Sequence, residues 1–374
     1  MNHPPGILHA LYSLRAEGCP RLAYDLLDQE MKQTGRRGFV TLLDPQDDLR
    51  RDYDQLGIPV HQLIWKRKNY ISIYQQFLKV LHQWKPAGVV LYPLGAHISL
   101  SLACRKLKIP HVVHLACLPP WRDFSALQKL RVQMWTGQVT TAAYAACSER
   151  VRHDCIRAYR LPPALVQTVY NGIALDRFDA LRSQRQPWTP HSGKPLIIGM
   201  TGSLELSKDH PTLLRAVALL KQQGHNLRLR LVGGGTQAVA LKQLASELQI
   251  SDIVDWTGSV RNVLAELARF DVYAFSAKPE EGLGIALIEA MASGMPVLAT
   301  DIPAVREIFK HHPHGVKVPF GDAKAMSTGI LNAAQQPAAP REALTPFDVA
   351  QTFREYEDIL ASQRQDGFRK LWQG

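Results

Sequence analysis

Residues 278–301 read KPEEGLGIALIEAMASGMPVLATD and combine a glycine-containing loop, an apolar helical segment and a strand. Residues 271–276, just before them, are apolar enough for a buried strand. Residues 285–292 suit a half-buried helix that ends at Gly294. The predicted order is strand, loop, helix and strand, which is the repeating unit of a parallel α/β sheet.

The loop of this stretch has the features of a phosphate site. Gly282 and Gly284 allow the backbone to approach a ligand closely, and the helix that starts there offers unpaired N–H groups and a positive dipole end to an anion. Glu281 lies in the loop and Glu289 follows on the helix, so one carboxylate can face a reacting group while the other accepts from the paired hydroxyls of a ribose. Without these neighbours, two such glutamates would more often be solvated surface charges.

The spacing of the two glutamates carries a family resemblance. Glu-Gly-Leu-Gly at 281–284, followed by Glu-Ala-Met-Ala-Ser-Gly-Met-Pro-Val at 289–297, resembles the Glu-x7-Glu region of the family 4 retaining glycosyltransferases (glycosyl transferases group 1). The resemblance implies an α/β protein of the GT-B fold, in which two Rossmann-like doubly wound domains face each other across a cleft. It also implies transfer of a hexosyl unit from a nucleotide sugar, with a UDP-sugar favoured, to a glycan or lipid-linked acceptor in bacterial envelope polysaccharide synthesis. Neither a metal nor a cofactor is implied.

The length of the chain agrees with two domains. A chain of 374 residues exceeds what one hydrophobic core usually spans, and clefts between domains bind ligands. We assign residues 1–180 to an N-terminal acceptor-binding domain that a C-terminal helix at 346–374 completes. Residues 196–345 are assigned to a nucleotide-sugar-binding domain, and residues 181–195 to the linker between the two.

Two candidate site residues lie in the N-terminal domain. Parallel sheets bind ligands at the carboxyl ends of their strands, so residues near the end of the predicted strand at 111–115 should line the cleft. The family often has a histidine at this strand end, which implies a catalytic role for His114, and a structural histidine is the alternative. The family also has a Gly-Gly pair in the first loop, which assigns Gly18 to the sugar donor, although this chain has Glu17-Gly18-Cys19 there.

In the second domain, Lys208 lies just before a predicted helix. A fixed positive charge beside a helix N-terminus suits a diphosphate, because the charge and the dipole act on the same group. The family commonly has an arginine where this chain has Ser203, directly after the glycine turn at Gly202. The resemblance therefore implies that Lys208 neutralises the phosphates alone, or together with Arg261 or Arg21.

Further positions match the family pattern for the sugar donor. Gly233 lies in a strand-turn segment before a helix, and Val260 ends a segment, 254–260, whose backbone reads the nucleotide base in the family. The resemblance implies Glu281, Lys208 and His114 as catalytic residues. The residues implied to bind the sugar donor are Gly18, Gly202, Ser203, Lys208, Gly233, Val260, Glu281, Gly282, Leu283, Gly284, Ile285 and Glu289, and no metal ligand is predicted.

Other classes of protein remain open. Residues 233–238 pass a loose Gly-x-Gly-x-x-Ala test for a dinucleotide site, with Asp252 or Asp255 near the expected acidic position, as in an NAD-dependent oxidoreductase. That fingerprint normally follows the first strand of its domain, and here it follows the second. The serine at Ser203 also fits a catalytically inert GT-B subunit that binds nucleotide or assists a partner enzyme. A two-carboxylate glycoside hydrolase would leave the phosphate-binding features unexplained.

The net charge of +11 comes from the first half of the chain. Residues 1–190 hold 25 Lys and Arg against 14 Asp and Glu, whereas residues 191–374 hold 19 of each. No nucleic-acid-binding module accompanies these charges, so we expect an anionic membrane surface rather than nucleic acid as a partner. Residues 121–135, with a tryptophan at each end, fit either a basic amphipathic helix in a membrane interface or a core-facing helix of the domain.

The cysteines and the start of the chain indicate the compartment. The five cysteines are odd in number and contain no Cys-x-x-Cys pair, which argues against a disulfide framework and fits a reducing environment. The start of the chain shows no signal peptide, and no apolar run is long enough to span a membrane. We expect a cytoplasmic location, with peripheral attachment to the inner face of the cytoplasmic membrane as an open option.

Overall fold

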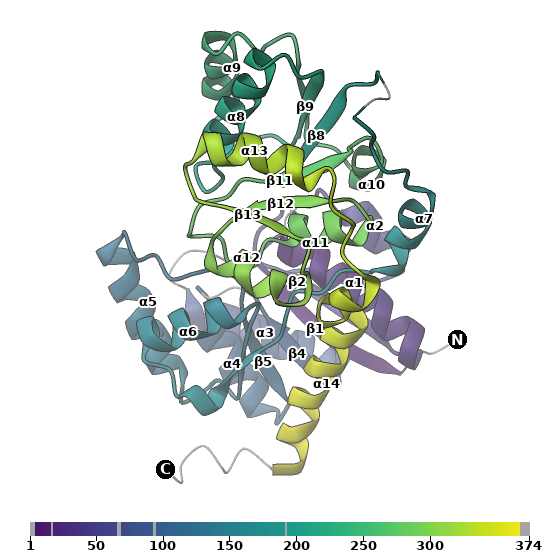
Figure 1. Ribbon diagram of the computed structural model, residues 1–374. Coiled ribbons are helices and arrows are strands. Elements are labelled where there is room, and N and C mark those ends of the chain that lie inside the picture. Colours follow the sequence, from purple (N-terminus) through teal and green to yellow (C-terminus); the bar gives the residue numbers. More distant parts are fainter. Residues whose placement is uncertain (1–3, 16–17, 66–68, 93–94, 191–192, 367–374) are drawn as a thin grey trace. The chain divides into compact units, whose positions relative to one another are not determined.

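The chain folds into two compact units, each with its own sheet (Figure 1). The computed structural model describes residues 4–15, 18–65, 69–92, 95–190 and 193–366. Unit 1 comprises residues 1–173 and 347–374, and unit 2 comprises residues 174–346. Each unit is described by itself below.

Unit 1 has, within its described residues, a seven-stranded parallel sheet with the order β3-β2-β1-β4-β5-β6-β7. Its strands are β1 (Pro5–Leu11), β2 (Arg37–Leu42), β3 (Val60–Gln62), β4 (Gly88–Leu91), β5 (His111–Leu115), β6 (Tyr144–Ala146) and β7 (Val166–Thr168). Its helices are α1 (Gly18–Thr34), α2 (Arg50–Gln55), α3 (Tyr70–Trp84), α4 (His97–Lys106), α5 (Phe124–Gly137), α6 (Glu149–Tyr159) and α14 (Val349–Asp366), with a 3-10 turn at Pro163–Leu165.

The central strands of unit 1 are apolar because helices cover both of their faces. Every residue of β4 and β5 is buried, which is typical of a parallel sheet with two covered faces. Several helices begin at a residue whose side chain accepts from a backbone N–H of the first turn, as Asn69 does before α3, Asp123 before α5 and Ser148 before α6. Sequence-encoded caps therefore set where these helices start.

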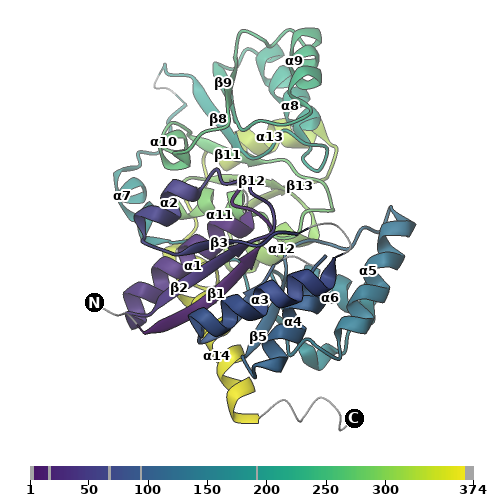
Figure 2. The ribbon, with the colours of Figure 1, turned by 180° about the vertical axis from the view of Figure 1, so that it is seen from behind.

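Helix α14 returns the end of the chain to unit 1, where it packs against α1 (Figures 1 and 2). Gln363 exchanges two hydrogen bonds with the backbone of His111, of 2.9 and 3.1 Å, as a neighbouring strand would. Arg36 forms an ion pair with Glu357 on this helix. These contacts attach the last described helix to β5 and to the turn before β2.

The described residues of unit 2 form a six-stranded parallel sheet with the order β10-β9-β8-β11-β12-β13. The strands are β8 (Leu196–Thr201), β9 (Leu227–Val232), β10 (Val254–Gly258), β11 (Val272–Phe275), β12 (Val297–Thr300) and β13 (Val316–Val318). The helices are α7 (Asp176–Gln184), α8 (His210–Gln222), α9 (Ala238–Glu247), α10 (Val263–Leu267), α11 (Ile285–Ala292), α12 (Pro303–Ile308) and α13 (Ala323–Ala333), with 3-10 segments at Phe309–His311 and Arg341–Phe347.

Both units have the predicted doubly wound α/β architecture, which is confirmed. The boundary differs from the expectation, because unit 2 begins at residue 174, and residues 176–184, which the sequence places at the end of the first domain and in the linker, form α7 of unit 2. Arg182 of this helix donates to the backbone carbonyl oxygens of Met291 and Ala339, at 3.2 and 2.5 Å. No helix of the described residues is long and apolar enough to cross a lipid bilayer.

Candidate active site

The strand order of unit 2 reverses between β8 and β11, which are neighbours in the sheet but far apart in the chain. Loops that leave two such strands diverge, and ligands bind at the switch point. The loop after β8 contains Gly202 and Lys208, and the loop after β11 contains Glu281 and Gly284. The structure therefore brings four of the predicted site residues to one edge of one sheet.

Backbone and side-chain hydrogen bonds hold these two loops together. Lys208 and Ala277 form an antiparallel β-bridge. Asp209 N donates to Ser276 O at 3.0 Å, and the Ser276 hydroxyl donates to Asp209 O at 2.7 Å. These contacts fix the backbone of Lys208 beside the loop that carries Glu281.

Lys208 has two partners in the site. Its Nζ donates to Glu281 Oε2 in an ion pair, and both side chains are mostly buried. The same Nζ lies 5.2 Å from the centre of the Phe275 ring, which is a cation–π contact. Because Phe275 is fully buried in β11, its ring is a rigid support for the ammonium group.

Gly284 forms the junction between the loop and helix α11. Its φ of +92° lies in the left-handed region, and a Cβ at this position would lie 3.1 Å from Phe275 Cζ. Glycine is therefore needed here both for backbone conformation and for space. The first turn of α11 contains no acidic residue, so its N–H groups and dipole offer a positive end to an anion.

Glu289 lies on α11, eight residues after Glu281, and both carboxylates act on the same tyrosine. The Tyr273 hydroxyl accepts from Thr201 N at 3.2 Å and donates to Thr201 O at 3.1 Å. Burial raises the pKa of Tyr273, and the negative charges of Glu289 and Glu281 raise it further. Both carboxylates are thus close enough to Tyr273 to influence its hydroxyl electrostatically.

The turns after β8 and β9 lie in close contact at Gly202 and Gly233. Gly202 has a φ of +144° and donates from its N to Val232 O at 2.9 Å. Gly233 has a φ of +147°, and a Cβ there would lie only 1.9 Å from Gly202 O. Gly233 therefore lets the two turns approach closely, while Gly202 lies next to Lys208, whose Cε would be 3.7 Å from a Cβ at position 202.

The other predicted residues of unit 2 lie at the same edge of the sheet. Ser203 is exposed directly after the Gly202 turn, and Val260 is half-buried just after β10. Leu283, within the Gly282–Ile285 segment, has a buried side chain. A ligand at this segment would therefore meet the backbone of Leu283 and not its side chain. Arg261, offered as a substitute for the missing arginine, is exposed next to Val260.

The two predicted residues of unit 1 have different settings. His114 is fully buried in β5, with its Nδ1 2.7 Å from the Tyr356 hydroxyl and its ring 5.0 Å from the Tyr92 ring. Burial lowers the pKa of His114 to about 3, which keeps the ring neutral near pH 7. These contacts agree with the structural alternative for His114, and its catalytic role stays a prediction. Gly18 is the first residue of α1, and Glu17 lies outside the described residues.

Phe275 and Tyr273, which support Lys208 and the end of β8, were not among the predicted site residues. In the sequence they are two apolar members of a buried strand. Their spacing of two places both side chains on the same face of β11. This spacing is the sequence feature that could have indicated a shared role. Their contacts depend on which strand lies beside β11.

The site can bind and stabilise a diphosphate. Lys208 and the N-terminus of α11 supply positive charge, and Glu281 and Glu289 supply carboxylates for hydroxyl groups or for a positively charged sugar. In the part of the chain that the structure describes, no group of three or more His, Cys, Asp or Glu side chains could hold a metal ion. The prediction of a reaction without metal stays a prediction.

Two Rossmann-like units in one chain, each with a parallel sheet, form the architecture of the GT-B fold. The chain belongs to the family 4 glycosyltransferases. Residues 26–177 match the family model "Glycosyltransferase Family 4", and residues 183–345 match "Glycosyl transferases group 1". The predicted family is thus confirmed.

Three relatives with known names are similar to this chain in sequence. N-acetyl-alpha-D-glucosaminyl L-malate synthase of Bacillus anthracis is 33% identical over 290 residues, which cover 76% of this chain and 71% of the relative. EpsD of Bacillus subtilis (strain 168), named as a glycosyltransferase, is 26% identical over 332 residues, or 83% of this chain and 85% of EpsD. The amylovoran biosynthesis glycosyltransferase AmsK of Erwinia amylovora is 28% identical over 182 residues, which span 45% of each chain.

A solved structure shares the fold over nearly the whole chain. Anabaena Alr3699/HepE in complex with UDP superposes with a TM-score of 0.76 at 20% identity, covering 96% of this chain and 100% of HepE. At this identity the likeness shows the fold.

Proposed function

We propose that this protein is a retaining glycosyltransferase that moves a hexosyl unit from a nucleotide sugar to a glycan or lipid-linked acceptor in bacterial envelope polysaccharide synthesis. The observation that carries the proposal is the Lys208–Glu281 ion pair beside the N-terminus of α11. A UDP-sugar is the favoured donor, which the UDP complex of the structural neighbour HepE supports. The amylovoran role of the relative AmsK supports a polysaccharide product.

The arrangement suits a leaving diphosphate. As the bond between the sugar and the diphosphate breaks, negative charge grows on the phosphate oxygens, and Lys208 together with the N–H groups of α11 stabilises it. Lys208 must then exchange Glu281 for the phosphate, which frees that carboxylate to support the positively charged sugar on the same face. Glu289 would accept from the ribose hydroxyls, and no metal is needed for charge neutralisation.

The test is a binding and turnover assay on the full chain. We expect UDP or another nucleoside diphosphate to raise the thermal unfolding temperature in the presence of EDTA, because a bound ligand stabilises the folded state. We also expect hydrolysis of, or transfer from, the matching nucleotide sugar without added metal, with the anomeric configuration of the product retained by NMR. Stabilisation by NAD alone would instead indicate a dinucleotide enzyme.

Two substitutions assign the carboxylates. Glu281→Ala should abolish turnover while the sugar donor still binds, and Glu289→Ala should chiefly raise the dissociation constant of the donor. Unchanged turnover in Glu281→Ala would remove the catalytic assignment. Normal donor affinity in Glu289→Ala would count against the ribose role.

The exposed Ser203, where the family commonly has an arginine, favours a second candidate function. An inert GT-B subunit would bind the nucleotide and assist a partner enzyme. This candidate predicts nucleotide-induced stabilisation without any turnover over a full panel of nucleotide sugars and acceptors. Introducing the arginine by Ser203→Arg should strengthen diphosphate binding in either case.

We place the reaction in the cytoplasm, at the inner face of the membrane. None of the five cysteines is part of a disulfide, which suits a reducing compartment. Unit 1 carries 26 Lys and Arg against 17 Asp and Glu, whereas unit 2 carries 18 against 16. The excess of positive charge on unit 1 supports attraction to an anionic membrane surface, and the described residues of the two units show no nucleic-acid-binding module.

A further inference from the structure

Two glycine-containing turns of unit 2 are joined by a glutamate beside the candidate active site. The first turn, called the lysine loop here, comprises residues 202–208 after β8. The second, called the glycine loop, comprises residues 233–237 between β9 and α9. Glu205 of the lysine loop accepts two hydrogen bonds from Thr236 of the glycine loop, one from its N at 2.8 Å and one from its hydroxyl at 2.6 Å.

These two bonds engage both oxygens of the half-buried Glu205 carboxylate. An ionised carboxylate forms stronger hydrogen bonds than a neutral oxygen, and two bonds to one residue fix its direction as well as its distance. The hydroxyl and the N–H of Thr236 lower the pKa of Glu205, so the carboxylate stays charged at a pH at which an ordinary surface glutamate takes up a proton.

Backbone hydrogen bonds join the same two loops. Leu204 N donates to Gly234 O, and Gln237 N donates to Leu204 O, each at 2.9 Å. A Cβ at Gly235 would lie 2.4 Å from Leu204 O, so glycine is needed for this close approach. The glycine loop therefore supports the lysine loop along its length.

The contacts of Glu205 continue directly to Lys208. Lys208 N donates to Glu205 O at 3.0 Å, so the two residues are the first and the last of one β-turn. On its other side, Lys208 forms the β-bridge with Ala277 described above. The lysine loop is thus held from both sides, by Glu205 toward β9 and by the Ala277 bridge toward β11.

We propose that Glu205 is a positioning residue for Lys208, and that it acts through Thr236 to hold the lysine loop in the shape that presents the ammonium group to a diphosphate. This role rests on the proposed function, because Lys208 belongs to the proposed site. A site with Ser203 in place of the family's arginine depends more strongly on where its one lysine is held.

The glycine loop acts in this arrangement as a support and not as a second phosphate site. A dinucleotide fingerprint would offer the N–H groups of such a loop to a pyrophosphate. Here the N–H of Thr236 is already bonded to Glu205. The negative charge of Glu205 would also repel a second phosphate group at the glycine loop.

The sign of one change in affinity distinguishes a positioning role from a purely electrostatic one. By its charge alone, a carboxylate near a diphosphate weakens anion binding, so Glu205→Gln would strengthen the binding of UDP. A positioning role predicts the opposite, because the loss of the contact with Thr236 loosens the lysine loop and weakens binding.

The experiment is isothermal titration of the full chain with UDP and with uridine. Glu205→Gln and Thr236→Val, which lacks the hydroxyl, should each weaken UDP binding by about five- to tenfold and leave uridine binding unchanged, because only the phosphates meet Lys208. Thr236→Ser keeps the hydroxyl and should retain the wild-type affinity. The double variant Glu205→Gln/Thr236→Val should lose no more than the weaker single variant, within about twofold.

A second cycle tests whether Glu205 acts through Lys208. In a protein with Lys208→Met, the further change Glu205→Gln should weaken UDP binding by no more than about twofold, since the group that Glu205 positions is absent. A full additional loss in that background would mean that Glu205 acts by another route, and it would overturn the proposal.

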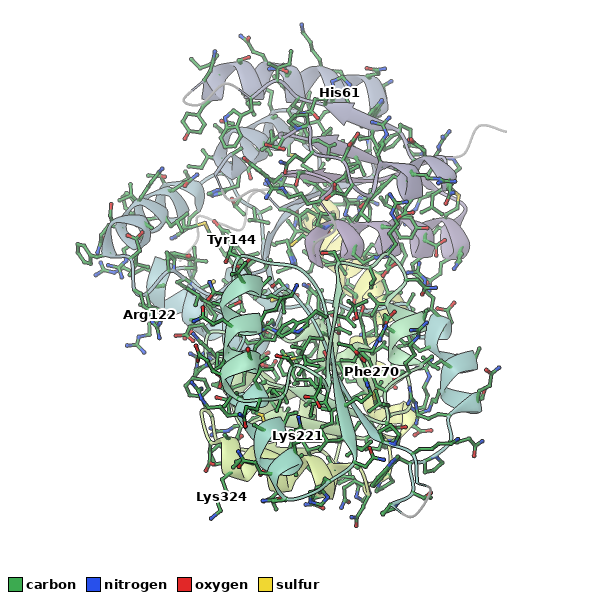
Figure 3. All side chains as sticks on the ribbon, turned by 90° about the horizontal axis from the view of Figure 1, so that it is seen from above. His61, Arg122, Tyr144, Lys221, Phe270 and Lys324 are labelled. Carbon is green, nitrogen blue, oxygen red and sulfur yellow. The ribbon has the colours of Figure 1, made fainter. Side chains whose placement is uncertain are left out.

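Matched controls come from two surface helices of unit 2. Glu247 on α9 accepts from Gln243 Nε2 at 3.0 Å, and Thr328 on α13 donates to Lys324 O at 3.3 Å. Figure 3 shows Lys324 extending away from the ribbon, so this part of α13 lies at the surface. Glu247→Gln and Thr328→Val make the same chemical changes and should leave UDP binding unchanged. Equal losses in the control variants, or unchanged or stronger UDP binding by Glu205→Gln, would overturn the proposal.

Hydrogen exchange of the ligand-free protein separates this inference from the proposed function. Glu205→Gln and Thr236→Val should speed amide exchange in the lysine loop and the glycine loop by about fivefold, with an unchanged thermal transition. Faster exchange in a protein that binds no nucleoside diphosphate would uphold the role of Glu205 in holding Lys208 while the proposed function fails. Donor turnover, with exchange and UDP binding unchanged in both variants, would do the reverse.

Discussion

Replacing Gly284 by alanine should weaken both unit 2 and its candidate site. The φ of +92° places this residue in the left-handed region, where an L side chain costs about 1–2 kcal/mol. The new Cβ would lie 3.1 Å from Cζ of the fully buried Phe275, and such overpacking costs about 1–3 kcal/mol. The two effects together predict a loss of about 2–5 kcal/mol in the free energy of unfolding of unit 2.

Gly321 provides the matched control within the same unit. Its φ is +75°, and a Cβ there would have no heavy atom within 4 Å. Gly321→Ala should therefore cost only the backbone contribution, about 1–2 kcal/mol. Urea unfolding of both variants, followed through the transition of unit 2, isolates the contact with Phe275 as the difference between them.

The same contact links Gly284 to ligand binding. Phe275 contacts the Lys208 ammonium group and lies close to Gly284 at the start of α11, so a displacement of the ring should disturb both positive groups. Isothermal titration with UDP should show at least about tenfold weaker binding for Gly284→Ala, which is a change of about 1.4 kcal/mol, and no change for Gly321→Ala. Equal destabilisation of the two variants, or undiminished UDP binding by Gly284→Ala, would refute this reasoning.

Three further predictions test other parts of the structure. Lys208→Met keeps the apolar stem of the side chain but removes its charge. Isothermal titration should show UDP binding weakened by about 1.5–3 kcal/mol and uridine binding unchanged. Equal losses for the two ligands would contradict the phosphate role of Lys208. Burial raises the pKa of Glu30 from 4.5 to about 7, so the folded state disfavours the ionised carboxylate and stability falls as pH rises between these values. Glu30→Gln should remove this slope, worth about 3 kcal/mol between pH 4.5 and 7 in urea unfolding, and a persisting slope would assign it elsewhere. Tyr356→Phe leaves the buried His114 Nδ1 without its hydroxyl partner and should cost unit 1 about 1–3 kcal/mol, a loss that an unchanged thermal transition would exclude.

Local sequence signals were sufficient for the strand, loop and helix around the two glutamates. The predicted strand at 271–276, helix at 285–292 and following strand correspond to β11, α11 and β12. Apolar runs of strand or helix length, bounded by glycines and a proline, predict these three elements. The two strands are buried on both faces, and the helix is buried along one stripe. The doubly wound fold follows from the same alternation repeated along the chain.

Contacts between distant residues could not be predicted. Lys208 and Glu281 are 73 residues apart, and their ion pair depends on the register in which Lys208 lies opposite Ala277. The support from Phe275 likewise requires that β8 and β11 be neighbours in the sheet. Amphipathic patterning also could not decide the role of residues 121–135, since it does not show which of two apolar stripes faces the core.

In the proposed function, a phosphate that binds Lys208 replaces Glu281 as the partner of the ammonium group, because the two side chains already form an ion pair. An incoming anion competes with a carboxylate that the protein already holds at a high effective concentration. Inorganic phosphate offers no contact beyond the one it displaces and competes poorly. A nucleoside diphosphate adds base and ribose contacts that offset the broken ion pair. We therefore expect the internal carboxylate to make the site selective against small anions and to keep the lysine in position between turnovers.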